Sequence, residues 1–366
     1  MRLRDLGYLT VFITASLPLQ SACMMRAGMP ADLAAWWPLL VIFGIVPLLD
    51  LAGGRELRNP IDPAEVQRLE RQRGFRLLTW ACLPVWLGLL TFCIAWFTLM
   101  PMGIAGQVGW LLSTGVIGGI LAINVAHELI HKAGWLEPWL GGIALTSVGY
   151  PGFKIEHLRG HHVHVSTPGD TSSAARGESV YRFIARGLTV NPRTAWQLEA
   201  ERLGRRGRSA WSLHNEMLRW WLLWLAMLVL TAVLCGFTGT AFFVAQGVVA
   251  ASTLEVINYI EHYGLRRARD AQGRYERVTH LHSWNASERL TNWLLFQLQR
   301  HSDHHAHARR RYQVLLHHPD SPQLPAGYAA MFVLALIPPL WRKIMDPRVD
   351  RHQAALALVS SANPGP

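Results

Sequence analysis

Residues 107–132 of this 366-residue chain read QVGWLLSTGVIGGILAINVAHELIHK. The part from 107 to 126 is almost wholly apolar, and about 20 such residues form a helix long enough to cross the hydrocarbon core of a membrane. Two histidines, His127 and His131, follow at once, with a spacing that places them on one helix face. Because neutral imidazole is the commonest metal ligand, the stretch predicts a membrane span that ends at a metal site.

Other apolar runs repeat this pattern along the chain. The sequence is 51% hydrophobic and only 16% charged, with 16 tryptophans, which lies outside the range of ordinary soluble domains. We therefore predict an all-α integral membrane protein with six transmembrane helices and a histidine-rich cap on the cytoplasmic side. The predicted spans are 6–25, 34–53, 77–99, 107–126, 218–236 and 239–258.

Loop charge predicts the orientation of these spans. Arginines crowd the segment after the second span, whereas the first, third and fifth connections have almost no lysine or arginine. The positive-inside rule then places both termini and the even-numbered loops in the cytoplasm, as in a multi-pass protein of the cell inner membrane. The net charge of +11 has the same origin, so we predict contact with membrane lipid and no binding of nucleic acid.

This topology divides the chain into four parts. Residues 1–126 hold the first four spans and a basic cytoplasmic loop, and residues 127–216 form a cytoplasmic part. Residues 217–258 hold the last two spans, and residues 259–366 form a second cytoplasmic part with a C-terminal tail. All the clustered histidines then lie on one side of the membrane.

Nine histidines occur in four short clusters, two in each cytoplasmic part. They are His127, His131, His157, His161, His162, His262, His301, His304 and His305. Nine imidazoles are too many for one metal ion, so two ions that share them are the economical interpretation. Iron fits two imidazole-rich sites that must also accept oxygen. Residues among and just before the ligands are candidates to orient the imidazoles: Glu128, Glu156, Glu261, Asp303, Asn124 and Asn258.

A different class of protein also contains the first cluster. The pattern His127-Glu128-x-x-His131 is a zinc-protease signature, in which the glutamate acts as general base. A catalytic zinc takes three protein ligands, and this would leave most of the clustered histidines unexplained. A membrane zinc protease is kept as the alternative from another class.

A redox metal beside apolar spans predicts attack by dioxygen on an apolar substrate that enters from the bilayer. Beyond the metal centre itself, we identify no catalytic residue. Ile42 and Phe43 on the second span are candidates to line the substrate channel. The chain has no C-x-x-C pair and no glycine-rich dinucleotide motif, so its electrons must come from another protein.

The four clusters, taken with their flanking residues, resemble the motifs of the membrane-bound alkane 1-monooxygenases. That family lies within a wider histidine-rich group that includes the xylene monooxygenases and fatty-acid desaturases. The resemblance covers nearly the whole chain and is carried most specifically by Asn258-Tyr-x-Glu261-His262-Tyr-Gly264 and by 298–306, LQRHSDHHA. Ser283-Trp284-Asn285 and the segment 325–349 match as well.

The resemblance implies a non-haem di-iron centre whose ligands are the nine histidines named above. It implies hydroxylation of an n-alkane at its terminal carbon, with dioxygen as co-substrate. It also implies electrons from rubredoxin, which an NADH-dependent rubredoxin reductase keeps reduced. Medium-chain alkanes are the first expectation, and a xylene-type aromatic, a terpene or a fatty acyl chain stays open as an alternative substrate.

Overall fold

The computed structural model describes residues 3–270 and 272–362, and this part of the chain is helical, with isolated bridges in place of β-strands. Five helical segments are long and apolar enough to cross a membrane. They are Asp5–Arg26, Ala31–Gly53, Arg73–Leu99, Ile104–Ile130 and Glu216–His262. The protein is therefore a membrane protein, and the first four segments agree with the predicted spans.

Several of these segments change helix type along their length. The first is η1 (Leu3–Thr10) followed by α1 (Val11–Arg26), and the third is α6 (Arg73–Leu99). The second contains α2 (Ala31–Ala34), α3 (Trp37–Leu40), the π-helical η2 (Val41–Ile45) and α4 (Val46–Gly53). The fourth contains α7 (Ile104–Gly118), the π-helical η3 (Gly119–Asn124) and α8 (Val125–Ile130). Such π-helical turns are rare and occur often near functional sites.

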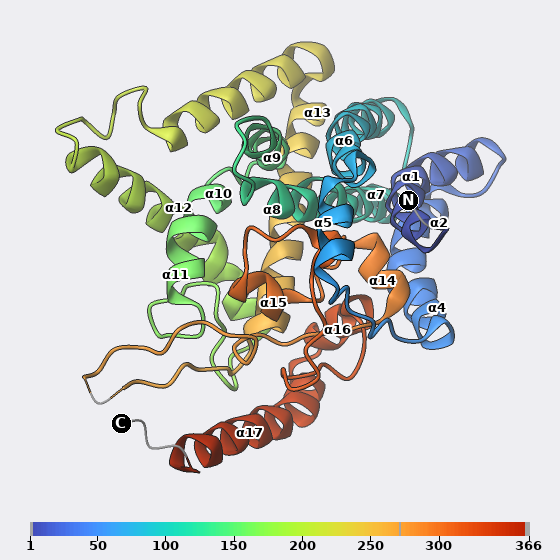
Figure 1. Ribbon diagram of the computed structural model, residues 1–366. Helices are drawn as coiled ribbons and strands as arrows, with labels where there is room; N and C mark the ends of the chain where they lie inside the picture. The colour runs from blue at the N-terminus through green and yellow to red at the C-terminus, as the bar shows by residue number, and fades with distance from the viewer. Residues whose placement is uncertain (1–2, 271, 363–366) are drawn as a thin grey trace.

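The two predicted spans 218–236 and 239–258 are continuous in α13 (Glu216–His262). Asn215 begins this helix, because its side chain accepts a hydrogen bond from the Leu218 N–H at 3.3 Å. At Gly236 the backbone leaves the helical region, with φ 64° and ψ −163°, a conformation that suits glycine. The helix therefore has two straight parts with a sharp bend between them, which Figure 1 shows near the top of the molecule.

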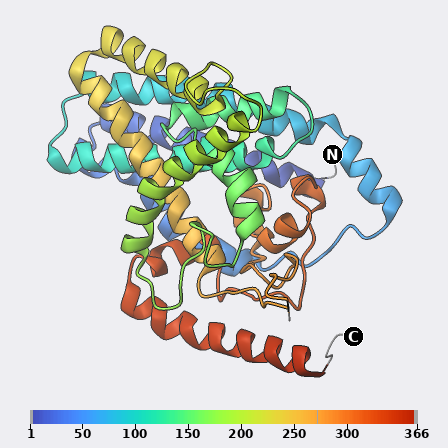
Figure 2. The ribbon, with the colours of Figure 1, turned by 90° about the vertical axis from the view of Figure 1, so that its left-hand side faces the viewer.

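The shorter elements lie between and after these segments. Their bounds are α5 (Pro63–Arg71), α9 (Leu136–Ser147), α10 (Phe153–Glu156), η4 (His157–His161), α11 (His162–His164), α12 (Val180–Gly204), α14 (Arg289–Leu294), α15 (His301–Ala306), η5 (Tyr312–Val314), α16 (Tyr328–Ala335) and α17 (Pro338–Ala362). Figure 2 shows α17 along one end of the molecule, away from the long helices. The apolar run near the C-terminal end is divided at Pro338, which begins a new helix after α16.

The core of the cap joins the end of α13 to α17. The ring centroids of Tyr259 and Trp341 are 5.1 Å apart, and those of Tyr263 and Trp341 are 5.4 Å apart. Tyr263 also donates a 2.6 Å hydrogen bond to Asp346. These contacts fix the direction in which α13 ends, and that end carries His262.

Candidate metal centre

The nine clustered histidines come together in two groups. Within each group, one nitrogen atom from every ring lies within 4.8 Å of the corresponding atoms of the other members. The first group, here called the five-histidine group, is His127, His131, His157, His162 and His304. The second, the four-histidine group, is His161, His262, His301 and His305. The groups adjoin, because the ring centroids of His162 and His305 are only 4.4 Å apart.

The nitrogen atoms in each group are spaced as the ligands of one ion would be. In the five-histidine group, Nε2 of His157 lies 3.1 Å from Nε2 of His131 and 3.0 Å from Nε2 of His162. In the four-histidine group, Nε2 of His305 lies 2.9 Å from Nε2 of His301. A metal–imidazole distance of ~2.1 Å separates two ligands at a right angle by ~3.0 Å. The two groups therefore fit one metal ion each.

Neighbouring histidines of one cluster belong to different groups, and the hydrogen-bonding pattern of the helix decides which histidines share a group. The second cluster lies on η4, a π-helical turn in which the His162 N–H donates to the carbonyl of His157. A π-helix aligns residues five apart, so His157 and His162 share a group, while His161 joins the other. On the α-helical α15, His301 and His305 are four apart and share a group, as an α-helix requires.

Most of the imidazoles are held in the neutral form that binds metal; His161 is the exception, because the charge and hydrogen bond of Asp170 outweigh burial and raise its pKa. Burial, reinforced by the neighbouring imidazoles, keeps the pKa of His157, His304 and His305 well below the usual histidine value. Nε2 of His127 and Nε2 of His304 have no hydrogen-bond partner among the described residues. Buried ring nitrogens without partners are costly unless a metal ion takes their lone pairs, which supports the fit of a metal to these residues.

Asp170 orients one of the clustered histidines, although it was not among the residues predicted to do so. Both of its carboxylate oxygens lie 3.0 Å from Nδ1 of His161, which donates to them. Burial alone would raise the pKa of Asp170, but the charge and hydrogen bond of His161 lower it to about 2. Since Nδ1 carries the proton, Nε2 of His161 is free to bind metal. The available signal was the turn at 167–170, which brings an aspartate back towards the cluster.

Of the six residues expected to orient imidazoles, Glu261 lies nearest to one. Its Oε2 is 3.1 Å from Nε2 of His301, the nitrogen that faces His262 and His305. The carboxylate is therefore on the metal side of the ring, whereas an orienting role would have placed it at the outer nitrogen.

The other three acidic candidates bind elsewhere. Glu128 pairs with Lys132 at 2.9 Å. Glu156 accepts a 3.2 Å hydrogen bond from Thr171. Asp303 accepts two hydrogen bonds of 2.7 Å from Arg310, and a third of 3.0 Å from the N–H of Leu316. These carboxylates fix the backbone around the histidine-bearing helices.

Asparagine and serine side chains complete the surroundings. Asn258 donates to Glu255 at 3.5 Å, and Asn124 lines the cavity described below. The Ser283 hydroxyl lies 3.3 Å from Nδ1 of His262, and the side-chain Oδ1 of Asn285 accepts a 3.0 Å hydrogen bond from the N–H of Ser302. The last two residues belong to the Ser283-Trp284-Asn285 match, although no role was assigned to them from the sequence.

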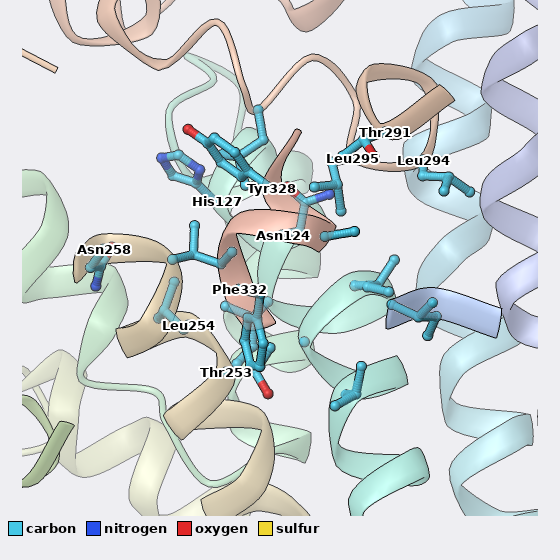
Figure 3. Close-up of a pocket in the computed structure, with 18 of the residues that line it drawn as sticks. Asn124, His127, Thr253, Leu254, Asn258, Thr291, Leu294, Leu295, Tyr328 and Phe332 are labelled. Carbon is cyan, nitrogen blue, oxygen red and sulfur yellow. The ribbon is translucent and has the colours of Figure 1, made fainter. Parts of the chain in front are cut away.

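An apolar cavity leads to both histidine groups. Its inner end is formed by His127 and His157 of the five-histidine group, and by His301 with Glu261 from the side of the four-histidine group. Figure 3 shows His127 near Tyr328 at this end, with Phe332 and Thr253 further along. The two residues expected along a substrate channel lie in the wall of this cavity: Ile42 and Phe43.

Comparison with known proteins agrees with this architecture. The model of the fatty acid desaturase family matches residues 103–335, which contain all nine histidines. The chain is 46% identical to alkane 1-monooxygenase 2 of Alcanivorax borkumensis, over 96% of this chain and 92% of that protein. It is 48% identical to alkane 1-monooxygenase 1 of Pseudomonas aeruginosa, over 95% and 91%. Alkane 1-monooxygenase 2 of the same organism is 47% identical, over 97% and 94%.

A membrane-embedded helical enzyme with two histidine groups is thus the class that the fold and the site define. At this identity and coverage, the chain belongs to the alkane 1-monooxygenase family, within the broader fatty acid desaturase family. It is a monooxygenase, and the predicted resemblance is confirmed.

Proposed function

We propose that this protein hydroxylates the terminal carbon of n-alkanes, medium-chain alkanes first, and yields primary alcohols. The main support for this proposal is that residues of both histidine groups line the inner end of one apolar cavity. Three relatives that are named alkane 1-monooxygenases, at 46–48% identity, support the same substrate class.

The nine histidines would hold two non-haem iron ions, five ligands at one site and four at the other. When bound, the irons would supply the reduction of dioxygen. One oxygen atom of dioxygen would be inserted into a C–H bond of the alkane. The other would be reduced to water, which takes up two electrons and two protons. An n-alkane has no group that can form a hydrogen bond, so the cavity would select the terminal methyl group by confining the chain end-on.

The two electrons would come from reduced rubredoxin, which an NADH-dependent reductase would reduce again after each transfer. The four cysteines, at positions 23, 82, 93 and 235, leave the chain without a C-x-x-C pair for an iron–sulfur site of its own. Of the nine histidines, His162 alone is not fully buried, and it lies next to the exposed Val163. His162 is therefore the clustered histidine nearest to solvent, and the Arg267 side chain donates a 2.9 Å hydrogen bond to the carbonyl of Val163 beside it. We propose this surface as the docking site for rubredoxin.

We also propose six membrane crossings, with the two straight parts of α13 as the fifth and sixth. Both histidine-bearing parts, 127–216 and 259–366, would then face the cytoplasm, next to the spans 1–126 and 217–258. The cell inner membrane and cytoplasmic termini follow from the arginine distribution. The terminal residues themselves, 1–2 and 363–366, lie outside the described residues.

Two alternatives are weaker. A xylene-type aromatic, a terpene or a fatty acyl chain would suit an apolar cavity, but the relatives cited above are all alkane 1-monooxygenases. A zinc protease would need Glu128 free as a general base beside one metal ion. Glu128 is instead paired with Lys132, and His127 and His131 share their group with three more histidines.

The test is product analysis with n-alkanes of graded length, using the full-length enzyme in lipid with rubredoxin and its reductase. We expect 1-alcohols, a strict requirement for dioxygen, and a maximum at medium chain length. Turnover without dioxygen, or hydroxylation of aromatic methyl groups with alkanes untouched, would overturn the proposal.

A further inference from the structure

The outer end of the apolar cavity is closed by two aromatic rings from different helices. Phe43 on η2 and Phe332 on α16 both line the cavity. Their ring centroids are 4.7 Å apart with an interplanar angle of 25°, so the rings stack. Both side chains are half-buried, so part of each ring is also accessible from the outer surface of the protein. They therefore separate the cavity from the surroundings of the two helices.

The outside of this contact is apolar. On the second segment, Leu40 is 57% exposed and Leu48 is 65% exposed. On the side of α16, Val333 is 39% exposed and Ile337 is 48% exposed. Leu40 and Leu48 belong to a membrane-spanning segment, where large exposed apolar side chains face lipid, and α16 packs beside this segment at η2. The stacked rings therefore lie between the cavity and the bilayer.

Hydrogen bonds to neighbouring elements hold the two helices near their ends. The second segment is bound at its start by Ser113, which donates to the carbonyl of Ala35 at 2.8 Å. At its end, Asp50 accepts a 3.0 Å hydrogen bond from the N–H of Thr291. Between these points lies the π-helical turn Val41–Ile45, which holds Phe43. A π-turn departs from the regular α-helical hydrogen bonds, occurs often at functional sites and is a common place for a helix to bend.

The same arrangement holds for α16. The N–H of Tyr328 donates to Gln299 at 2.8 Å, and the carbonyl of Leu336 accepts from Tyr181 at 2.7 Å. Phe332 lies between these two anchors. A displacement of the two rings would therefore open the cavity without loss of the anchors that position the metal-binding elements.

We propose that Phe43 and Phe332 form a gate through which the hydrocarbon enters from the bilayer, and that the gate admits unbranched chains. This inference rests on the proposed function and adds the entry route and the basis of shape selectivity. The stacked rings part far enough for a methylene chain, whereas a quaternary carbon needs a wider opening. Phe43 and Phe332 make a ring contact with each other, at positions outside the nine clustered histidines, so the gate acts on which substrate arrives.

The test compares n-octane with 4,4-dimethyloctane, whose branch in the middle of the chain must pass the rings. In lipid nanodiscs with rubredoxin and its reductase, we expect Phe43→Ala and Phe332→Ala to raise kcat/KM for the branched alkane relative to n-octane about tenfold. Phe43→Leu and Phe332→Leu, which keep more of the apolar volume, should show smaller shifts in the same direction. Leu40→Ala and Val333→Ala are matched controls on the lipid side and should leave the ratio unchanged.

A second readout does not depend on turnover. Linear and branched alkyl diazirines, activated by light, should label residues at the inner end of the cavity, which mass spectrometry maps. In the wild-type protein we expect labelling by the linear probe alone, and in the alanine variants labelling by both. If neither the rate ratio nor the labelling changes in Phe43→Ala and Phe332→Ala, the gate is refuted. If the wild-type enzyme fails to oxidise n-octane but labelling follows the expected pattern, the proposed substrate is wrong and the gate stands.

Discussion

The two histidine groups contain the same ligand type in different surroundings. The four-histidine group is wholly buried and has two carboxylates against its rings, Asp170 at His161 and Glu261 at His301. The five-histidine group has no carboxylate hydrogen-bonded to its rings among the described residues, and its member His162 reaches the surface. Two metal sites with the same ligand type can therefore differ in their surroundings and in how firmly they hold an ion. We expect the carboxylates to hold the ion of the four-histidine group more firmly.

The largest expected effect comes from two adjacent ligands that belong to different groups. His304→Ala removes a ligand from the five-histidine group, and His305→Ala removes one from the four-histidine group. Each variant should lower alkane hydroxylation by more than about 100-fold, because a lost ligand costs more than a lost outer contact. Iron analysis should show about one ion lost per chain in each case. Near-normal turnover in both variants would break the assignment of the groups.

The next effect concerns Asp170. Asp170→Asn keeps the shape of the side chain but removes the charge that orients His161. We expect a 10- to 100-fold loss of activity or metal affinity, confined to the four-histidine group. Titration with a chelator should remove one iron earlier than in the wild type. Asp350→Asn is the control, since Asp350 is exposed and pairs with Arg176 at the surface. An unchanged chelator profile in Asp170→Asn would show that the carboxylate is not what distinguishes the groups.

Glu261 should have a smaller effect. Glu261→Gln replaces the carboxyl group beside Nε2 of His301 with an amide at the inner end of the cavity. We expect about a tenfold drop in turnover with much of the iron retained, because all nine histidines stay in place. The exposed Glu276, which contacts His282, offers Glu276→Gln as a control. Full activity of Glu261→Gln would exclude a role for this carboxylate at the metal centre.

The smallest effect is expected at a histidine outside both groups. His164 ends α11, two residues after His162, and is exposed. His164→Ala should keep the iron content and the activity, with a change in stability within about 0.5 kcal/mol, as for most surface substitutions. Loss of an iron from this variant would mean that the boundary of the five-histidine group is drawn wrongly.

Much of the helical framework could be predicted from the sequence. The apolar runs predict where the long helices lie, because a span must satisfy its own backbone hydrogen bonds over a fixed length. The fifth predicted span ends at residue 236, where the helix bends, but one glycine in an apolar run does not predict a positive φ. The π-helical turns could not be predicted from the sequence either, because their hydrogen bonding depends on packing against neighbouring helices.

At the site, the nine histidines could be named from their spacing, but their division into groups could not. Simple helical spacing pairs His157 with His161, and the π-turn separates them. Asp170 reaches His161 through a loop whose path depends on Ser172 and Ser173 bonding the same carboxylate. Loop paths of this kind are set by tertiary contacts, which a single sequence does not display.

The most direct measurement is the metal content and alkane turnover of one purified, lipid-embedded sample, before and after chelation and again after addition of ferrous iron. We expect the untreated sample to contain about two irons per chain and little zinc. We also expect turnover to fall with the iron and to return with it. An iron-free sample that still converts n-alkanes to 1-alcohols at the full rate would contradict the account.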